Sequence, residues 1–254
     1  IISAVFCAIK LKKMDDVFDL NLSMMKPLRK YVLDLLKLGL PSGMTQVIFS
    51  LAMITVQSLT NTFGELFIAC NVIVMRVDGF AMMPNFSFGM AMTTYAGQNV
   101  GAKRLDRVEL GTRQGLGIAV GISTFITIII LIFGRYLMNI FTDTVELVDL
   151  SMKMMRILAI GYIAMAVTQV LSGVMRGAGD TLTPMWLSLI TTFFLRVPIA
   201  YGLVFLTRSA QYPNGRPESV FISLVTAWVC GAMITAYFYK KGSWRNKALI
   251  KNVE

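Results

Sequence analysis

The residues of this chain best suited to chemistry are three polar side chains inside one long apolar stretch, Asn71, Asp78 and Asn85. They are spaced by seven, so in a helix, at about 100° per residue, they share one face. Pro84 lies on the same stretch and would loosen the helical hydrogen bonding, which makes it a candidate hinge. In a bilayer such a stripe predicts a water-filled cavity, with Asp78 as the natural site for a cation or a proton.

A structural role for Asp78 is an alternative, because two arginines also lie deep in apolar stretches. Arg76 is a poor partner, since two positions along a helix turn a side chain to the opposite face. Arg196 lies on another stretch and could form a structural ion pair with Asp78. A position of Asp78 nearer the membrane interface is a third possibility. The candidates for ion coupling are therefore Asp78, Asn71, Asn85, Arg76 and Arg196.

A second polar stripe precedes the first. Its members fall within about 60° of one another on a helix: Gln46, Ser50, Met53, Gln57 and Asn61. Amide dipoles and soft Met thioethers suit a surface that accepts varied organic cations, so the first four are candidates for a substrate cavity. Hydrogen bonding between helices is the alternative, and commoner, role of intramembrane glutamines.

Composition indicates which elements must position these residues. The chain is 56% hydrophobic and only 15% charged, against about a quarter charged residues in soluble domains. A span needs roughly 20 apolar residues in helix, and suitable stretches are 39–63, 66–96, 114–141, 154–175, 182–207 and 219–239. We expect an all-α integral membrane protein with a six-helix transmembrane bundle at residues 38–240.

The ends of the chain complete the predicted organisation. Residues 1–9 are apolar and precede a cluster of lysines, which indicates the end of a truncated transmembrane helix and a fragmentary chain. Residues 10–37 are expected to form a linker with an amphipathic helix on the membrane surface, with Pro27 in its first turn. An ordinary connector is the alternative, and commoner, role of such a segment. Residues 241–254 form the predicted tail.

Charge distribution predicts orientation. Lys and Arg gather on one set of alternate connections, which the positive-inside rule places in the cytoplasm together with the linker and the tail. The net charge of +10 is thereby explained by topology and contact with anionic lipid headgroups, without a nucleic-acid site. The chain has no His, no paired Cys spacing and no GxxxxGK[ST] motif, which argues against a metal site, a cofactor and ATP hydrolysis.

Glycines with small-xxx-small spacing indicate close helix packing, as in the pairs 97/101, 111/115, 117/121 and 173/177. The segment from Gly177 to Thr181 instead predicts a tight cytoplasmic corner, where Asp180 or Thr181 caps the next helix and Pro184 lies in its first turn. Candidate hinge and loop residues are Pro84, Gly97, Gly101, Arg176, Gly177, Gly179, Asp180 and Pro198.

Several of these motifs occur together in a specific order. They are Met83-Pro84, Phe88-Gly89, GQNVGAK at 97–103, LSGVMRGAGDT at 171–181, Pro184-Met185 and Arg196-Val197-Pro198. The region 38–239 resembles the C-terminal half, helices seven to twelve, of a multidrug and toxic compound extrusion (MATE) transporter. In that family two six-helix lobes enclose a central cavity. The resemblance implies a multi-pass protein of a bacterial plasma membrane whose N-terminal lobe is missing from this chain.

The same resemblance implies antiport of small organic cations and amphipathic compounds in exchange for Na⁺ or H⁺, by alternating access. Some family members carry coupling acids in helices seven and ten. Here residues 42–61 and 161–173 contain no Asp or Glu, so coupling falls to the missing lobe or to Asp78.

Three other functions compete with antiport. A lipid-linked saccharide flippase of the same superfamily would need a cavity rich in Arg or Lys. An integral-membrane enzyme is disfavoured, because the chain has no His and no nucleophile motif. A membrane scaffold that transports nothing is the remaining alternative.

Overall fold

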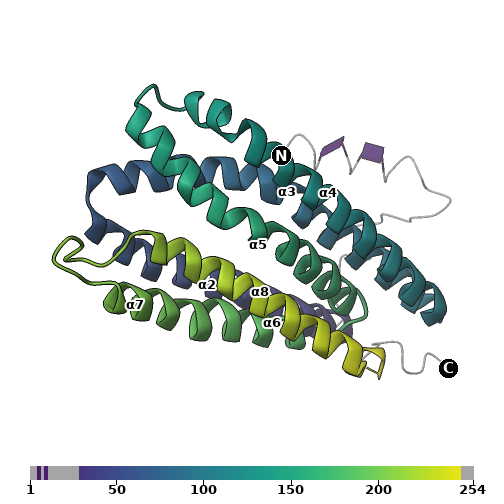
Figure 1. Cartoon of the computed structure of the whole chain (residues 1–254). Coiled ribbons are helices and arrows are strands. Elements are labelled where there is room, and N and C mark those ends of the chain that lie inside the picture. Colours follow the sequence, from purple (N-terminus) through teal and green to yellow (C-terminus); the bar gives the residue numbers. More distant parts are fainter. Residues whose placement is uncertain (1–4, 7–8, 11–28, 247–254) are drawn as a thin grey trace. The chain divides into compact units, whose positions relative to one another are not determined.

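The computed structural model describes residues 5–6, 9–10 and 29–246 (Figure 1). Most of the predicted truncated helix at 1–9 lies outside the described residues, as do Pro27 with the rest of 11–28 and the tail beyond Asn246. The chain divides into two units, residues 1–39 and residues 40–254. The second unit contains the helices that carry the candidate site.

Within the described residues, six helical segments are long and apolar enough to cross a membrane. In order they are α2 (Arg29–Thr60), α3 (Glu65–Gly101), α4 (Leu105–Asn139), α5 (Val145–Gly177), the composite α6–η3–α7, and α8 (Glu218–Lys241). Short 3₁₀ turns follow α2 and α8, η2 (Asn61–Phe63) and η4 (Ser243–Asn246). The predicted all-α membrane bundle is confirmed. Residues 29–37, expected in the linker helix, are continuous with the first span in α2.

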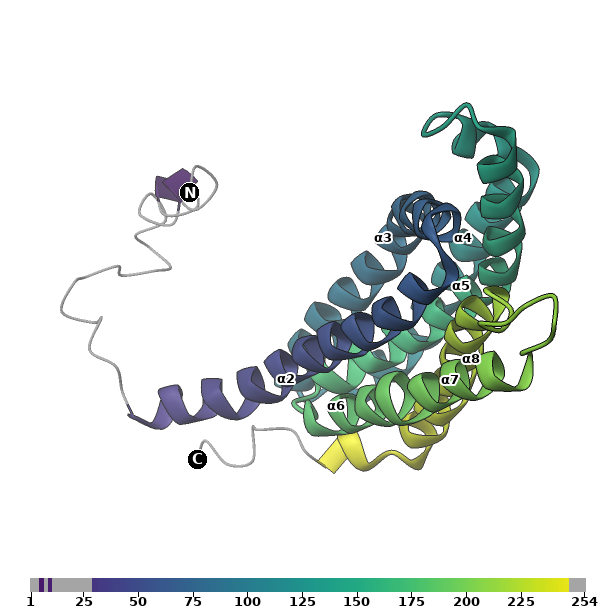
Figure 2. The same cartoon turned by 90° about the vertical axis from the view of Figure 1, so that its left-hand side faces the viewer.

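The fifth span consists of three segments without an intervening loop: α6 (Leu182–Ser188), the π-helical η3 (Leu189–Leu195) and α7 (Arg196–Leu206) (Figure 2). Pro198 is the third residue of α7 and has no N–H to donate to the preceding turn. π-helical turns are wider than α-helical turns and are rare in proteins. Those that do occur are often found at functional sites.

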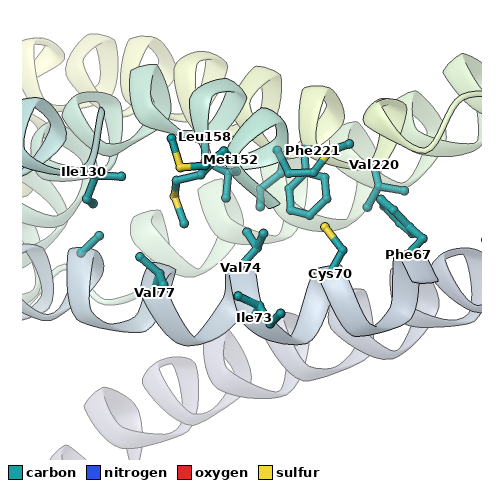
Figure 3. Close-up of a cluster of buried hydrophobic side chains, with 14 of the residues drawn as sticks. Phe67, Cys70, Ile73, Val74, Val77, Ile130, Met152, Leu158, Val220 and Phe221 are labelled. Carbon is teal, nitrogen blue, oxygen red and sulfur yellow. The ribbon is translucent and has the colours of Figure 1, made fainter. Parts of the chain in front are cut away.

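Helix α5 is the centre of the unit, because α3, α4 and α8 all pack against it (Figure 1). Its second half, residues 161–175, has no exposed side chain, whereas its first half presents Asp149, Lys153 and Arg156 on one exposed face. Figure 3 shows one of the two apolar clusters, in which Phe67 and Val74 of α3 meet Leu158 of α5 and Phe221 of α8. Large apolar side chains on the outer face of α4, such as Phe125, remain exposed, as expected for a surface in lipid.

Glycines allow α3 and α5 to approach backbone to backbone. A Cβ atom at Gly173 would collide with the carbonyl oxygen of Gly89, and one at Gly177 would collide with that of Thr93. The predicted packing role of this glycine pair is thus confirmed. It is wrong for Gly117 and Gly121 within the described residues, where an added Cβ would meet open space.

The predicted corner between α5 and α6 is also confirmed. Gly179 has a φ of +91°, a conformation that glycine adopts without steric cost. The buried Asp180 carboxylate accepts hydrogen bonds from the Thr183 backbone N–H (3.1 Å) and hydroxyl (2.7 Å). Asp180 therefore stabilises the start of α6, where Pro184 lies in the first turn.

Candidate functional site

A cavity of about 490 Å³ lies among α2, α3, α5, α8 and the composite fifth span. The lining residues lie in one half of the helical bundle. This is the half nearer to the α3–α4 connection (102–104) and the α5–α6 connection (178–181). The apolar lining includes Phe49, Phe86, Met90, Met165, Leu187, Leu224 and Trp228. The polar lining includes Ser42, Thr45, Gln46, Thr93, Thr94, Thr168, Gln169, Ser172, Arg176, Ser188, Thr191, Thr192, Arg196 and Thr235. Its size is that of pockets for drug-sized ligands.

Most of the lining threonines are satisfied by their own helices. The hydroxyls of Thr45, Thr93 and Thr168 donate to backbone carbonyls four residues earlier, at 2.8 to 3.0 Å. Such residues present a methyl group and a hydroxyl oxygen to the cavity at little desolvation cost. The wall is therefore amphipathic and is suited to ligands with both apolar and polar parts.

Arg196 lies at the junction of η3 and α7 and is only 6% exposed. Its Nη1 is 3.8 Å from the Met53 sulfur, and its Nε has no hydrogen-bond partner. Such a buried, under-satisfied guanidinium is costly unless water or a ligand completes its bonding. Arg196 is thus a buried charge at the cavity whose hydrogen bonding the protein leaves incomplete.

Asp78 of α3 lies close enough to Arg196 for the two charges to attract each other, and it interacts with the Tyr162 hydroxyl of α5. The ion pairs among the described residues do not include Asp78 or Arg196, and Asp78 Oδ1 has no hydrogen-bond partner. The two groups are neighbours without direct contact, so the structural ion pair considered from the sequence is not formed. Asp78 is outside the cavity lining.

The other residues of the first stripe have separate environments. Asn85 is 1% exposed and donates to the Tyr162 carbonyl at 3.2 Å, which ties α3 to α5. Asn71 donates to Gln57 of α2 at 3.4 Å, and Arg76 is exposed. None of these residues lines the cavity, so the predicted shared face does not form one polar chamber.

The second stripe contributes one residue to the cavity, Gln46. Ser50 donates to the Gln46 carbonyl at 3.1 Å, and Gln57 donates to Asn61 at 2.9 Å. Met53 contacts Arg196 but lies outside the lining. Gln57 shows the alternative role, hydrogen bonding between helices, because it accepts from Asn71 of α3.

Sequence reasoning missed the cavity face of α5. Thr168, Ser172 and Arg176 are spaced by four and share one face, and all three line the cavity. This spacing was the available signal, but Arg176 was assigned only to the corner. Thr191 and Thr192 were missed because a π-helical segment does not follow the 3.6-residue period.

Sequence comparison gives the relationship of this bundle to known proteins. The profile of the MatE family matches residues 41–202, which contain most of the cavity. The chain belongs to the MatE family. This confirms the resemblance seen in the glycine-rich motifs and the Arg196-Val197-Pro198 segment.

Curated relatives of the family are about twice as long as the chain. The chain is 25% identical to the probable multidrug resistance protein YoeA of Bacillus subtilis (strain 168) and covers 46% of it, with 87% of the chain aligned. It is 23% identical to the probable multidrug resistance protein NorM of Thermotoga maritima, with 92% of the chain aligned to 49% of NorM. The chain thus spans about half the length of the curated relatives it matches.

Solved structures confirm the fold. A crystal structure of MATE in complex with MaL6 superposes with a TM-score of 0.84 at 22% identity, covering 94% of this chain and 53% of that one. An outward-facing MATE family transporter of the MOP superfamily gives the same TM-score and coverage. The relatives and solved structures are named for drug resistance and transport, in agreement with the expectation of a multi-pass membrane protein that is not an enzyme. Their names do not favour the flippase alternative.

Proposed function

We propose that the chain forms one six-helix lobe of a secondary transporter that exports amphipathic organic compounds by alternating access. The observation that carries this proposal is the cavity of about 490 Å³ inside the bundle, with an apolar wall, satisfied threonines and buried Arg196. Such a lining accommodates varied apolar shapes, because methyl, thioether and aromatic groups impose little directional bonding. The second lobe of the complete protein would enclose the other side of the substrate path.

We further propose that exchange for Na⁺ or H⁺ supplies the energy and that Asp78 takes part in coupling. Asp78 is a carboxylate inside a predicted span, it has an oxygen without a hydrogen-bond partner, and it is close to Arg196 at the cavity. Binding of a cation or proton at Asp78 would change the field at Arg196, and therefore at the cavity, without contact between ion and substrate.

The test uses the protein expressed from its complete reading frame in membrane vesicles, with imposed Na⁺ or H⁺ gradients and fluorescent amphipathic compounds of both charges. Asp78→Asn removes the charge with little change of volume, so we expect loss of gradient-driven transport with substrate binding retained. Asp149→Asn is the matched control, because Asp149 is half exposed and pairs with Arg135 at 3.0 Å away from the cavity. Gradient-driven transport at the wild-type rate in Asp78→Asn would remove Asp78 from the coupling path.

A further inference from the structure

The described residues that line the cavity contain two positive charges and no negative charge. Arg176 and Arg196 are its only ionisable groups apart from hydroxyls, and a guanidinium stays protonated in proteins. A cavity selected for cations would place carboxylates near the ligand and would keep fixed positive charge away from it. The lining therefore has the wrong sign for the organic cations that the family resemblance implies.

Arg196 supplies an unused donor at the inner end of the cavity. Its Nε is unpartnered and its Nη1 has only the Met53 sulfur, a weak acceptor, at 3.8 Å. Asp78 attracts Arg196 from outside the lining but forms no ion pair with it. The guanidinium therefore keeps hydrogen-bonding capacity that the described protein groups do not use.

Arg176 supplies a second cation from α5. The ion pairs and side-chain hydrogen bonds among the described residues do not include its guanidinium. Gln169, one turn away from Ser172 on the same wall, and Gln46 on α2 add neutral amide donors. Donors from three helices therefore face a cavity whose remaining wall contains Phe49 and Trp228.

We propose that this cavity binds amphipathic organic acids, with Arg196 holding the carboxylate or sulfonate, Arg176 adding positive charge at the end of α5, and the aromatic wall holding the apolar body. A planar guanidinium matches such groups through paired N–H···O bonds. The proposal deepens the proposed function, on which its role in export rests, but the site is testable by binding alone.

The experiment compares two xanthene dyes of similar size and opposite charge, anionic fluorescein and a cationic rhodamine methyl ester. Equilibrium binding to the purified complete protein in detergent is followed by fluorescence anisotropy. We expect tighter binding of fluorescein, with a loss of affinity for fluorescein of about tenfold or more in Arg196→Gln and a smaller loss in Arg176→Gln. Affinity for the rhodamine ester is expected to stay the same or to rise.

Two further variants keep the test decisive. Arg196→Lys retains the charge and is expected to keep the preference for fluorescein, although with weaker binding because the paired geometry is lost. Arg156→Gln removes an exposed arginine of α5 that does not line the cavity, so both affinities are expected to be unchanged. If Arg196→Gln does not fold, Arg176→Gln decides the outcome alone, since Arg176 is only half-buried.

The outcomes separate the site from transport. Tighter binding of the rhodamine ester, or fluorescein binding that is unchanged in both Gln variants, overturns the organic-acid site. Arginine-dependent fluorescein binding without gradient-driven transport in proteoliposomes supports the site and contradicts the proposed function. Transport of the rhodamine ester alone supports the proposed function and overturns the inference.

Discussion

Asn85 and Asn71 are two amides on one helix whose contributions to stability should differ. Asn85 is buried and donates to the Tyr162 carbonyl, whereas Asn71 is partly exposed and makes a long bond of 3.4 Å to Gln57. We expect Asn85→Ala to lower the free energy of unfolding by about 1–2 kcal/mol, since it loses a buried hydrogen bond. Asn71→Ala should cost less than about 0.5 kcal/mol. Thermal unfolding in detergent would measure both, and equal effects would contradict the assignment of Asn85 as a tie between α3 and α5.

The polar residues of α3 also illustrate how much about single residues could be predicted from the sequence. Helical spacing predicted that Asn71, Asp78 and Asn85 share one face of α3. Their hydrogen-bond partners are on other helices, Gln57 on α2 and Tyr162 on α5, and Arg196 on α7 supplies the charge that attracts Asp78. The role of each side chain depends on which neighbouring helix lies opposite it at that depth in the membrane. The periodicity of α3 alone does not contain that information.

At the scale of elements, the contact between α3 and α5 gives the sharpest matched pair of variants. Gly173→Ala would place a methyl group against the Gly89 carbonyl, which belongs to a backbone that cannot move aside. We expect a loss of about 1–3 kcal/mol in unfolding free energy, typical of overpacking. Gly121→Ala adds the same methyl group in open space and should be neutral or slightly stabilising, because Ala favours helix. Thermal unfolding of the two variants tests this, and a stable Gly173→Ala protein would mean that the helices can separate.

The number and order of the spans were predictable from hydropathy, whereas α4 and α5 begin nine residues before the predicted starts at 114 and 154. The spans and the Asp180 corner follow from long apolar runs and from cap and glycine signals. The small-xxx-small pattern was ambiguous: it marks a close contact at Gly173 but open space at Gly117 and Gly121. This spacing indicates only that another helix could approach closely without a steric clash. Whether a helix lies against the glycines depends on how the whole bundle packs. The π-helical η3 was invisible for a similar reason, since nothing in its composition differs from that of an α-helix.

At the scale of the whole molecule, η4 packs against the end of α8 and links it to α4. Trp244 is fully buried, stacks on Tyr239 at 5.3 Å between ring centroids and donates to the Tyr239 carbonyl at 3.0 Å. The neighbouring Arg245 pairs with Glu109 of α4 at 2.7 Å, with both side chains about half exposed. Trp244 therefore supplies buried area, and Arg245 supplies a screened ion pair.

We expect Trp244→Ala to reduce stability by about 3–5 kcal/mol, as for other large core truncations. Arg245→Ala should cost at most about 1 kcal/mol, and less at high salt, because exposed ion pairs are weak and screened. Thermal unfolding at low and high salt separates the two contributions. A salt-sensitive loss in Trp244→Ala would show that the ion pair, and not the buried ring, holds this end of α8.

The backbone contact between α3 and α5 has a mechanical consequence for the cavity. These two helices form one side of its wall and touch through main-chain atoms at Gly89, Thr93 and the glycines of α5, so this side is stiff. The wall also contains the fifth span, whose π-helical turn interrupts the α-helical pattern, and we expect this span to be the more compliant side. We expect ligands of different bulk to be accommodated by adjustment of that compliant side. Tolerance of molecular size and discrimination of charge would then be independent properties of the lobe, and each could be altered without loss of the other.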